Sequence, residues 1–117
     1  MAAGKYNFTI DQGSDFLTFF IIKTTSTSGV TTIRNLTGFQ ARASLRPTIE
    51  SSVVYNFSAG VTSPGTDGKI VMSLSSVRSR DIPAGIYRYD LEIFNTGTGS
   101  VERVLSGQVT LTREVTR

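Results

Sequence analysis

The side chains of this sequence that could do acid–base chemistry are chiefly carboxylates, because its 117 residues include no histidine and no cysteine. A catalytic site would therefore need paired carboxylates or a Ser–Lys arrangement. Asp11 and Asp15 flank one expected turn. Asp81 and Asp90 bracket an expected strand end, and neither pair has a spacing that would bring two carboxylates together, whereas acidic residues at turns are ordinary local caps. The sequence predicts no enzyme, no catalytic or metal-ligating residue and no cofactor.

Three tyrosines could take part in a different chemistry, the recognition of sugars. Tyr55, Tyr87 and Tyr89 could stack on sugar rings if they were exposed. The carboxylates of Asp67 and Asp90 would then accept hydrogen bonds from sugar hydroxyls. All three tyrosines, however, fall on strand faces where apolar and polar residues alternate, which favours a place in the core or at a corner. A carbohydrate-binding module is therefore an alternative, and a small-molecule ligand is not expected.

Composition and charge set the outer limits of the fold and of the partners. A chain of 117 residues buries about two thirds of its unfolded surface, which suffices for one domain covering residues 1–117. Twelve Lys and Arg against nine Asp and Glu give a net charge of +3, but the arginines are scattered rather than clustered as in a nucleic-acid binder. No segment approaches the ~20 apolar residues of a membrane span, and the N-terminus lacks the apolar region of a secretory signal. We expect a soluble protein without nucleic-acid or membrane partners.

The elements that would position these side chains are organised around the stretch 81–92. Pro83 fixes its own φ and Gly85 can adopt the positive φ that most residues avoid, so the stretch begins as a turn. From Tyr87 onward, apolar and charged residues alternate with the period of a half-buried strand. An aromatic residue near the start of a strand entered through such a turn is similar to the tyrosine corner of immunoglobulin-like sandwiches. Gly85 and Tyr87 are accordingly expected to form a structural corner.

A nearly unbroken apolar run covers residues 15–23. It contains Phe16, Phe19 and Ile21 and lacks the alternation of a strand with one wet face. The run predicts either a central strand covered on both sides or a strand with one face against a partner protein. Burial within the domain is favoured, because exposed aromatic runs are uncommon on monomers. The polar segment 11–14 before it would form a turn or bulge through which the chain switches between two sheets.

The rest of the chain shows short strands separated by turns. Alternation of apolar and polar residues predicts strands at 5–10, 40–46, 53–57, 70–74, 85–94 and 101–111. Turn residues predict hairpins or exposed loops at 24–32, 63–68 and 95–100. Ser75 or Ser76 would cap one helical turn, and Gly107 would allow a bulge in the last strand. About seven or eight strands at this spacing predict an all-β fold, an immunoglobulin-like antiparallel β-sandwich.

Four blocks of residues, taken together and in order, resemble a known family. The blocks are Tyr6-x-Phe8-x-Ile10-x-Gln12-Gly13, Asn35-Leu36-Thr37-Gly38-Phe39-x-Ala41-Arg42, Ala84-Gly85-x-Tyr87-x-Tyr89-Asp90-Leu91 and Gly107-x-Val109-x-Leu111-x-Arg113-Glu114-Val115-Thr116. They resemble small immunoglobulin-like structural domains of tailed-bacteriophage virions, including those of cyanobacterial phages and the N-terminal module of upper baseplate proteins. The resemblance covers nearly the whole chain.

The resemblance implies a structural role. It implies a virion protein, made in the host cytoplasm and present in several copies per particle, that docks on neighbouring virion proteins as an adaptor or joint of the tail, baseplate or neck and can attach fibres. Capsid decoration is the alternative within the same class. Edge strands and apolar runs can hold a partner, and polar tails can become ordered on one. The candidate interface residues are therefore Phe16, Phe19 and Ile21 of the apolar run and Arg113 and Val115 of a short polar C-terminal tail. For the tail, 113–117, a disordered end is favoured over an arm that becomes ordered on a neighbour.

Overall fold

A computed structural model describes residues 4–48, 53–62 and 64–113 of the chain. Arg113 is thus the last described residue of the expected polar tail, and Val115 lies outside the described residues. The strands are β1 (Gly4–Lys5), β2 (Phe8–Asp11), β3 (Phe16–Ile21), β4 (Lys23–Thr25), β5 (Thr31–Ile33), β6 (Gln40–Arg46), β7 (Tyr55–Val61), β8 (Lys69–Leu74), β9 (Gly85–Asn95) and β10 (Ser100–Thr112). The helical elements are the 3₁₀ turn η1 (Gly65–Asp67) and the short helix α1 (Ser76–Arg80).

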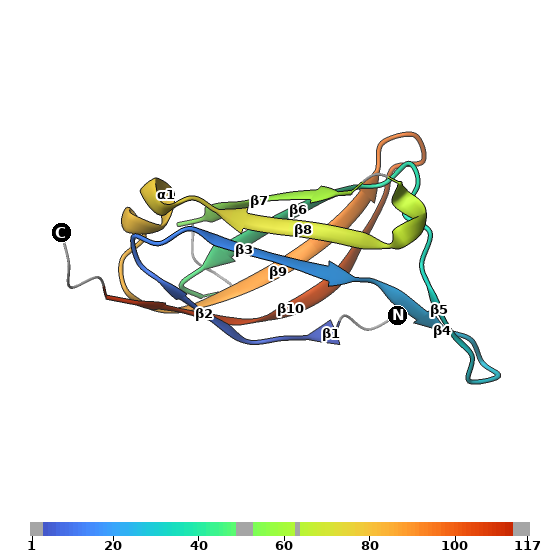
Figure 1. Cartoon of the computed structure of the whole chain (residues 1–117), viewed down its shortest axis with the longest axis horizontal. Helices are drawn as coiled ribbons and strands as arrows, with labels where there is room; N and C mark the ends of the chain where they lie inside the picture. The colour runs from blue at the N-terminus through green and yellow to red at the C-terminus, as the bar shows by residue number, and fades with distance from the viewer. Residues whose placement is uncertain (1–3, 49–52, 63, 114–117) are drawn as a thin grey trace.

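Eight of these strands form one curled sheet, and β4 and β5 form a separate hairpin (Figure 1). The order across the sheet is β1, β10, β9, β6, β7, β8 and β3, and β2 also pairs with β10. The sheet folds over on itself, so that β3 and β8 lie in one layer and β6, β9 and β10 in the other. The predicted all-β sandwich is therefore confirmed. It is mixed rather than wholly antiparallel, because β1 and β2 run parallel to β10.

Strand β7 joins the two layers of the sandwich. Its first residues pair with β6, where Tyr55 lies opposite Leu45. Its later residues pair with β8, where Val61 lies opposite Ile70. The strand therefore belongs to both layers, and the loop after it, at 64–68, makes the β7–β8 hairpin that the turn residues predict.

The core lies between the layers and follows the predicted alternation. On β9, Tyr87, Tyr89, Leu91 and Ile93 are all buried. The other buried apolar side chains come from both layers and their connections, and they include Ile10, Leu36, Ala43, Leu45, Phe57, Ile70, Met72, Leu74, Ile82, Val109 and Leu111. Burial of apolar area at about 25 cal/mol per Å² makes this inner set the main stabilising contribution.

The corner at the start of β9 has the expected local geometry. The Tyr87 hydroxyl donates a hydrogen bond to the Pro83 carbonyl at 2.6 Å, which is the back-bond of a tyrosine corner. Gly85 adopts a φ of 152°, a value that residues with a side chain rarely take. Just upstream, the Ser75 hydroxyl accepts a hydrogen bond from the Arg78 N–H and caps α1, as the sequence predicts.

The last strand, β10, has a covered outer edge. The N-terminal segment, expected as a single strand at 5–10, is split into β1 and β2, and both lie along β10. Between them the Asn7 side-chain oxygen accepts a hydrogen bond from the Gln108 N–H at 2.9 Å. The Tyr89 hydroxyl reaches across from β9 and donates to the Tyr6 carbonyl at 2.5 Å. These contacts fasten the N-terminal segment to the sandwich.

The prediction of a bulge at Gly107 is wrong. The register between β9 and β10 shifts between Arg103 and Leu105. Gly107 instead lies where the N-terminal segment passes closest, since a Cβ built there would be 2.3 Å from the Tyr6 carbonyl oxygen. The glycine allows close approach of two backbones rather than an extra residue in one strand.

Candidate functional site

Strand β3 presents a row of exposed apolar side chains on its outer face. Leu17 is 72% exposed, Phe19 56% and Ile21 46%. The alternate residues point inward, and the Phe16 ring stacks on the Phe8 ring with centroids 5.0 Å apart. The favoured expectation of a central strand covered on both sides is therefore wrong, because β3 ends the sheet order and one of its faces is exposed.

The expected interface residues divide between the two faces of β3. Phe19 and Ile21 face outward, whereas Phe16 packs inward against the core. Leu17 is the most exposed of the three outward residues, but the sequence-based prediction did not include it. Its spacing of two and four residues from Phe19 and Ile21 places it on the same strand face and could have identified it. Arg113 is exposed after the end of β10.

The backbone of β3 is also open along one edge. The Ile22 N–H donates to the Gly68 carbonyl, and the Ile22 carbonyl accepts from the Arg34 N–H, both at 2.8 Å. Hydrogen-bonding direction alternates along a strand, so the even residues of 16–24 face β8 and then β5. The odd residues of 17–23 direct their N–H and C=O groups to the other side, where none of the described strands pairs with them (Figure 1).

Phe19 is held in place by a neighbour on β8. The Lys69 ammonium nitrogen lies 4.2 Å from the centroid of the Phe19 ring, within the range of a cation–π contact. Val71 lies directly opposite Phe19 in the ladder and is partly exposed on the same face. The outward ring is therefore supported from the side, which reduces the entropy that a partner would have to remove on binding.

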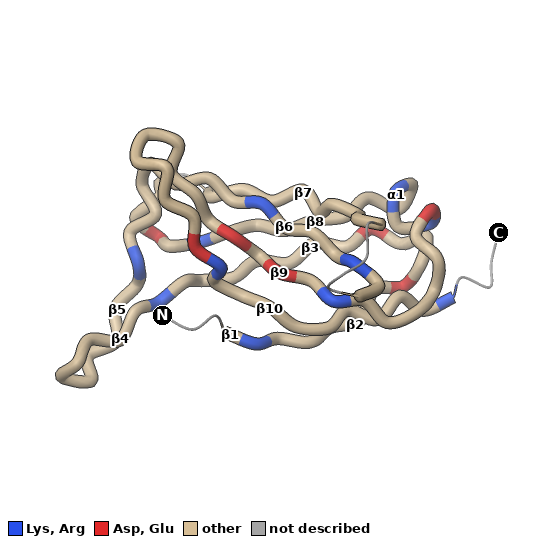
Figure 2. The backbone as a smooth tube through the Cα atoms, turned by 180° about the vertical axis from the view of Figure 1, so that it is seen from behind, with Lys and Arg blue, Asp and Glu red and all other residues tan. Residues whose placement is uncertain are grey.

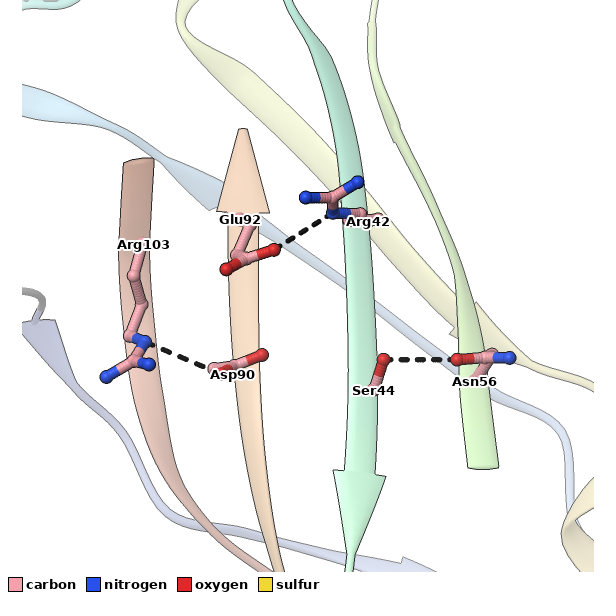
Figure 3. A network of polar contacts seen from close by, with 6 residues as sticks. All are labelled: Arg42, Ser44, Asn56, Asp90, Glu92 and Arg103. Atoms are coloured by element: carbon pink, nitrogen blue, oxygen red, sulfur yellow. Dashed lines mark hydrogen bonds and ion pairs between the residues drawn. The ribbon is translucent and has the colours of Figure 1, made fainter. Parts of the chain in front are cut away.

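The opposite layer has an outer face of a different kind, with acidic and basic residues spread over β6, β9 and β10 (Figure 2). Arg103, Glu92 and Arg42 form one row across three strands. In this row the Arg42 Nε donates to a Glu92 carboxylate oxygen at 2.9 Å. In the next row Ser44 donates to Asn56 at 3.1 Å (Figure 3). Arg42 and Glu92 thus complement each other's charge on this face.

Asp90 on this face has a carboxyl with a raised pKa. Burial raises the pKa of the Asp90 carboxyl above its ordinary value, and the nearby Glu92 carboxylate adds to the effect. The guanidinium of Arg103, whose Nε is 3.4 Å from an Asp90 oxygen, opposes it, and so do two further arginines. The dominant cause is therefore loss of solvent rather than a missing counter-charge.

A shallow hollow of about 760 Å³ covers part of this charged face. Its lining includes four basic residues, Lys5, Arg46, Arg88 and Arg103, and two acidic ones, Asp90 and Glu92. Arg46 and Arg88 lie directly opposite each other on β6 and β9, a like-charge pairing that disfavours the strand contact. The hollow therefore has a surplus of positive charge and would favour an acidic surface over a basic one.

The other chemistries considered from the sequence find little support in the geometry. Tyr87 and Tyr89 are buried, so neither ring is open to a sugar, and burial raises the pKa of both phenols. An Asp15 oxygen accepts from the Ser76 N–H at 2.7 Å, and an Asp11 oxygen accepts from the Thr112 hydroxyl at 2.8 Å. These acids serve local structure. Among the described residues no group of three metal-binding side chains occurs, and no helix is long and apolar enough to cross a membrane.

Comparisons with known proteins show distant structural similarity and no family. The chain matches no family model and no curated protein. Similar solved structures include Listeria monocytogenes InlP, with 16% identity and a TM-score of 0.44, covering 96% of this chain and 27% of that one. The NK cell receptor Nkp44 has 11% identity and a TM-score of 0.47, covering 96% and 100%. A family 123 glycoside hydrolase from Clostridium perfringens has 10% identity and a TM-score of 0.41, covering 97% and 24%.

This chain thus spans about a quarter of the length of InlP and of the glycoside hydrolase. At these identities and TM-scores the three similarities carry no argument about fold or function. The functional proposal therefore rests on the surfaces of this molecule.

Proposed function

We propose that this chain is a non-enzymatic structural protein of a tailed-bacteriophage virion, an adaptor or joint of the tail, baseplate or neck that docks on neighbouring virion proteins. The four sequence blocks that resemble virion immunoglobulin-like domains support the setting. The site geometry favours a protein-contact role, because Asp11 and Asp15 accept local hydrogen bonds. Tyr87 and Tyr89, two of the three tyrosines considered for sugar stacking, are buried.

The observation that carries the proposal is the open edge of β3. Leu17, Phe19 and Ile21 place apolar side chains on the outer face of the strand and unpaired backbone groups at its edge. A strand of this kind can accept a strand from a partner, since backbone hydrogen bonds supply affinity and side-chain contacts supply specificity. Left uncovered, it would instead favour aggregation.

A joint needs a second contact surface, and the charged face on the other layer provides one. The hollow there carries surplus basic residues. The strands β6, β9 and β10 that line it form the layer opposite β3 (Figure 1). A partner with an acidic surface would be attracted to it, and that attraction would weaken as salt increases. Two chemically different faces on one small rigid domain suit a protein that connects two others.

The test is the location of the protein in purified particles of the phage that encodes it. Mass spectrometry of gradient-purified virions should detect the chain, and a cryo-electron-microscopy map should place several copies at the tail, baseplate or neck. Density spread over the capsid would replace this proposal with capsid decoration. Presence in the infected-cell lysate together with absence from virions would refute a structural role in the particle.

A further inference from the structure

The outward side chains of the apolar run form a pattern that is symmetric about its centre. Reading the odd residues in order gives Asp15, Leu17, Phe19, Ile21 and Lys23. All five are exposed. Phe19 stands at the centre, with an aliphatic residue on each side, an acid at one end and a base at the other. Such a pattern is complementary to itself when the strand is reversed.

Antiparallel pairing of two copies about Phe19 gives each of the five side chains a complementary partner. Leu17 would lie opposite Ile21 of the second copy, and Asp15 opposite Lys23, because paired residue numbers then sum to a constant. A register shifted by two residues would set Leu17 against Lys23 or Ile21 against Asp15, an apolar side chain against a charge. A shift by one would turn the side chains of one copy to the other face. Parallel in-register pairing would place like charges together, which is destabilising. Only the Phe19-centred antiparallel register matches apolar with apolar and acid with base.

We propose that two copies of this chain associate through their β3 edges, in antiparallel register about Phe19, and form a continuous sheet across a two-fold axis. The open-edge backbone groups of Leu17, Phe19 and Ile21 would each exchange hydrogen bonds with the second copy. This inference rests on the proposed function only in treating β3 as an interface. It names the occupant of that edge as a second copy and leaves the charged face for a different virion protein.

The end charges are available for this pairing. In the described residues Lys23 forms no ion pair. One Asp15 oxygen accepts from the Ser76 N–H, which leaves the second oxygen of the carboxylate for a partner. Opposite-charge pairs across strands contribute modestly to affinity, and their larger effect is to select register and orientation. Phe19 should therefore determine the strength of association and the two charges its geometry.

The first experiment measures self-association of the purified chain by sedimentation equilibrium from nanomolar to high micromolar concentration. We expect a reversible dimer. Phe19→Lys should weaken it about tenfold or more, because two charges would meet at the centre of the interface. Val101→Lys is the matched control, since Val101 is a strand residue on β10 with 55% exposure against 56% for Phe19. Far-UV circular dichroism should show both variants folded.

The second experiment tests the register. Lys23→Glu should weaken the dimer, because the new carboxylate would lie opposite Asp15 of the second copy. The double variant Asp15→Lys with Lys23→Glu should restore the dimer, because opposite charges would again face each other. A wild-type chain that stays monomeric at all concentrations would overturn the inference. So would a dimer that Phe19→Lys leaves intact, or a charge exchange that gives no rescue in a folded double variant.

The outcome is separable from that of the virion test. A dimer found in solution, with no copy of the chain in purified particles, would leave this inference standing and remove the proposed function. A monomer that is nevertheless present in particles would do the reverse.

Discussion

The two ends of the sheet order differ in how their edges are treated. At one end, β10 is covered by β1 and β2, and Tyr89, Asn7 and Gly107 all help the N-terminal segment lie against it. At the other end, β3 is left open, and its outward residues are apolar. A chain that only needed to avoid aggregation would protect both edges, with charges, a bulge or a covering segment. The contrast is what we expect if a partner uses the β3 edge, as proposed above.

The contrast is sharpest at Gly107, where we expect the largest effect on folding. Gly107→Ala would place a methyl group 2.3 Å from the Tyr6 carbonyl oxygen, so the N-terminal segment would have to move off β10. We expect a loss of about 3 kcal/mol in the free energy of unfolding, measured by urea denaturation.

Gly60→Ala is the matched control for that substitution. Gly60 is also a glycine within a strand, but a Cβ built there meets no atom within 4 Å. The expected result lies between no change and a gain of about 1 kcal/mol. Equal losses in the two variants would show that the covered edge has no special dependence on Gly107.

Tyr89 should give a smaller effect that is confined to the same edge. Tyr89→Phe removes the hydrogen bond to the Tyr6 carbonyl and should cost about 1–2 kcal/mol, because the acceptor is left partly buried. Hydrogen exchange should speed up at the Tyr6 amide, which bonds to Ser106. Tyr87→Phe breaks a bond within the corner at Pro83 and should leave that amide protected. The same exchange pattern in both variants would contradict the assignment of Tyr89 as the anchor.

At the open edge, truncation should have almost no effect on the monomer. Leu17→Ser removes an exposed aliphatic side chain. The free energy of unfolding, measured at a protein concentration too low for the dimer to form, should therefore change by less than about 0.5 kcal/mol. A loss of several kcal/mol would mean that the outer face of β3 is covered within the monomer.

The smallest expected effect lies on the charged face and concerns pH. The pKa of Asp90 is higher in the folded chain than its ordinary value, so the folded state binds the proton more tightly than the unfolded state. The contribution of Asp90 to stability is therefore greatest at low pH and falls as pH rises through the raised pKa. Asp90→Asn should remove that fall and leave the variant at least as stable as wild type at neutral pH.

Glu92→Gln provides the comparison for this measurement, because it breaks the ion pair with Arg42 on the same strand face. Its cost at neutral pH should be below about 1 kcal/mol. A pH-dependent loss of stability in Asp90→Asn, in place of relief, would contradict the sign of the pKa shift.

Local patterns predicted the fold well where each residue faces either core or water. The alternation of Ala41, Ala43 and Leu45 with polar residues gave the correct faces of β6, and Pro47 marks its end. The exposed hairpin of β4 and β5 and the short helix capped by Ser75 follow equally from turn and capping residues. In these places one short-range signal decides the conformation.

The sequence did not predict the structure correctly where the conformation depends on a segment far away in the chain. The run around Phe19 has apolar residues on both faces, so periodicity could not distinguish a buried central strand from an exposed edge. The parallel pairing of β1 and β2 with β10 joins residues about a hundred positions apart, and nothing local encodes it. Gly107 was recognised as special, but whether a strand glycine permits a bulge or a close approach depends on what lies beside it.

The parallel pairing of the first and last strands also determines how the domain would carry a load. Gly4 lies beside Leu105 and Asp11 beside Thr112, so the described chain begins at one end of this pair and finishes at the other (Figure 1). Tension applied between the termini would pull β2 and β10 in opposite directions along their length. The hydrogen bonds between them would then be strained together in shear rather than opened one after another, and a joint built this way resists stretching far better than peeling.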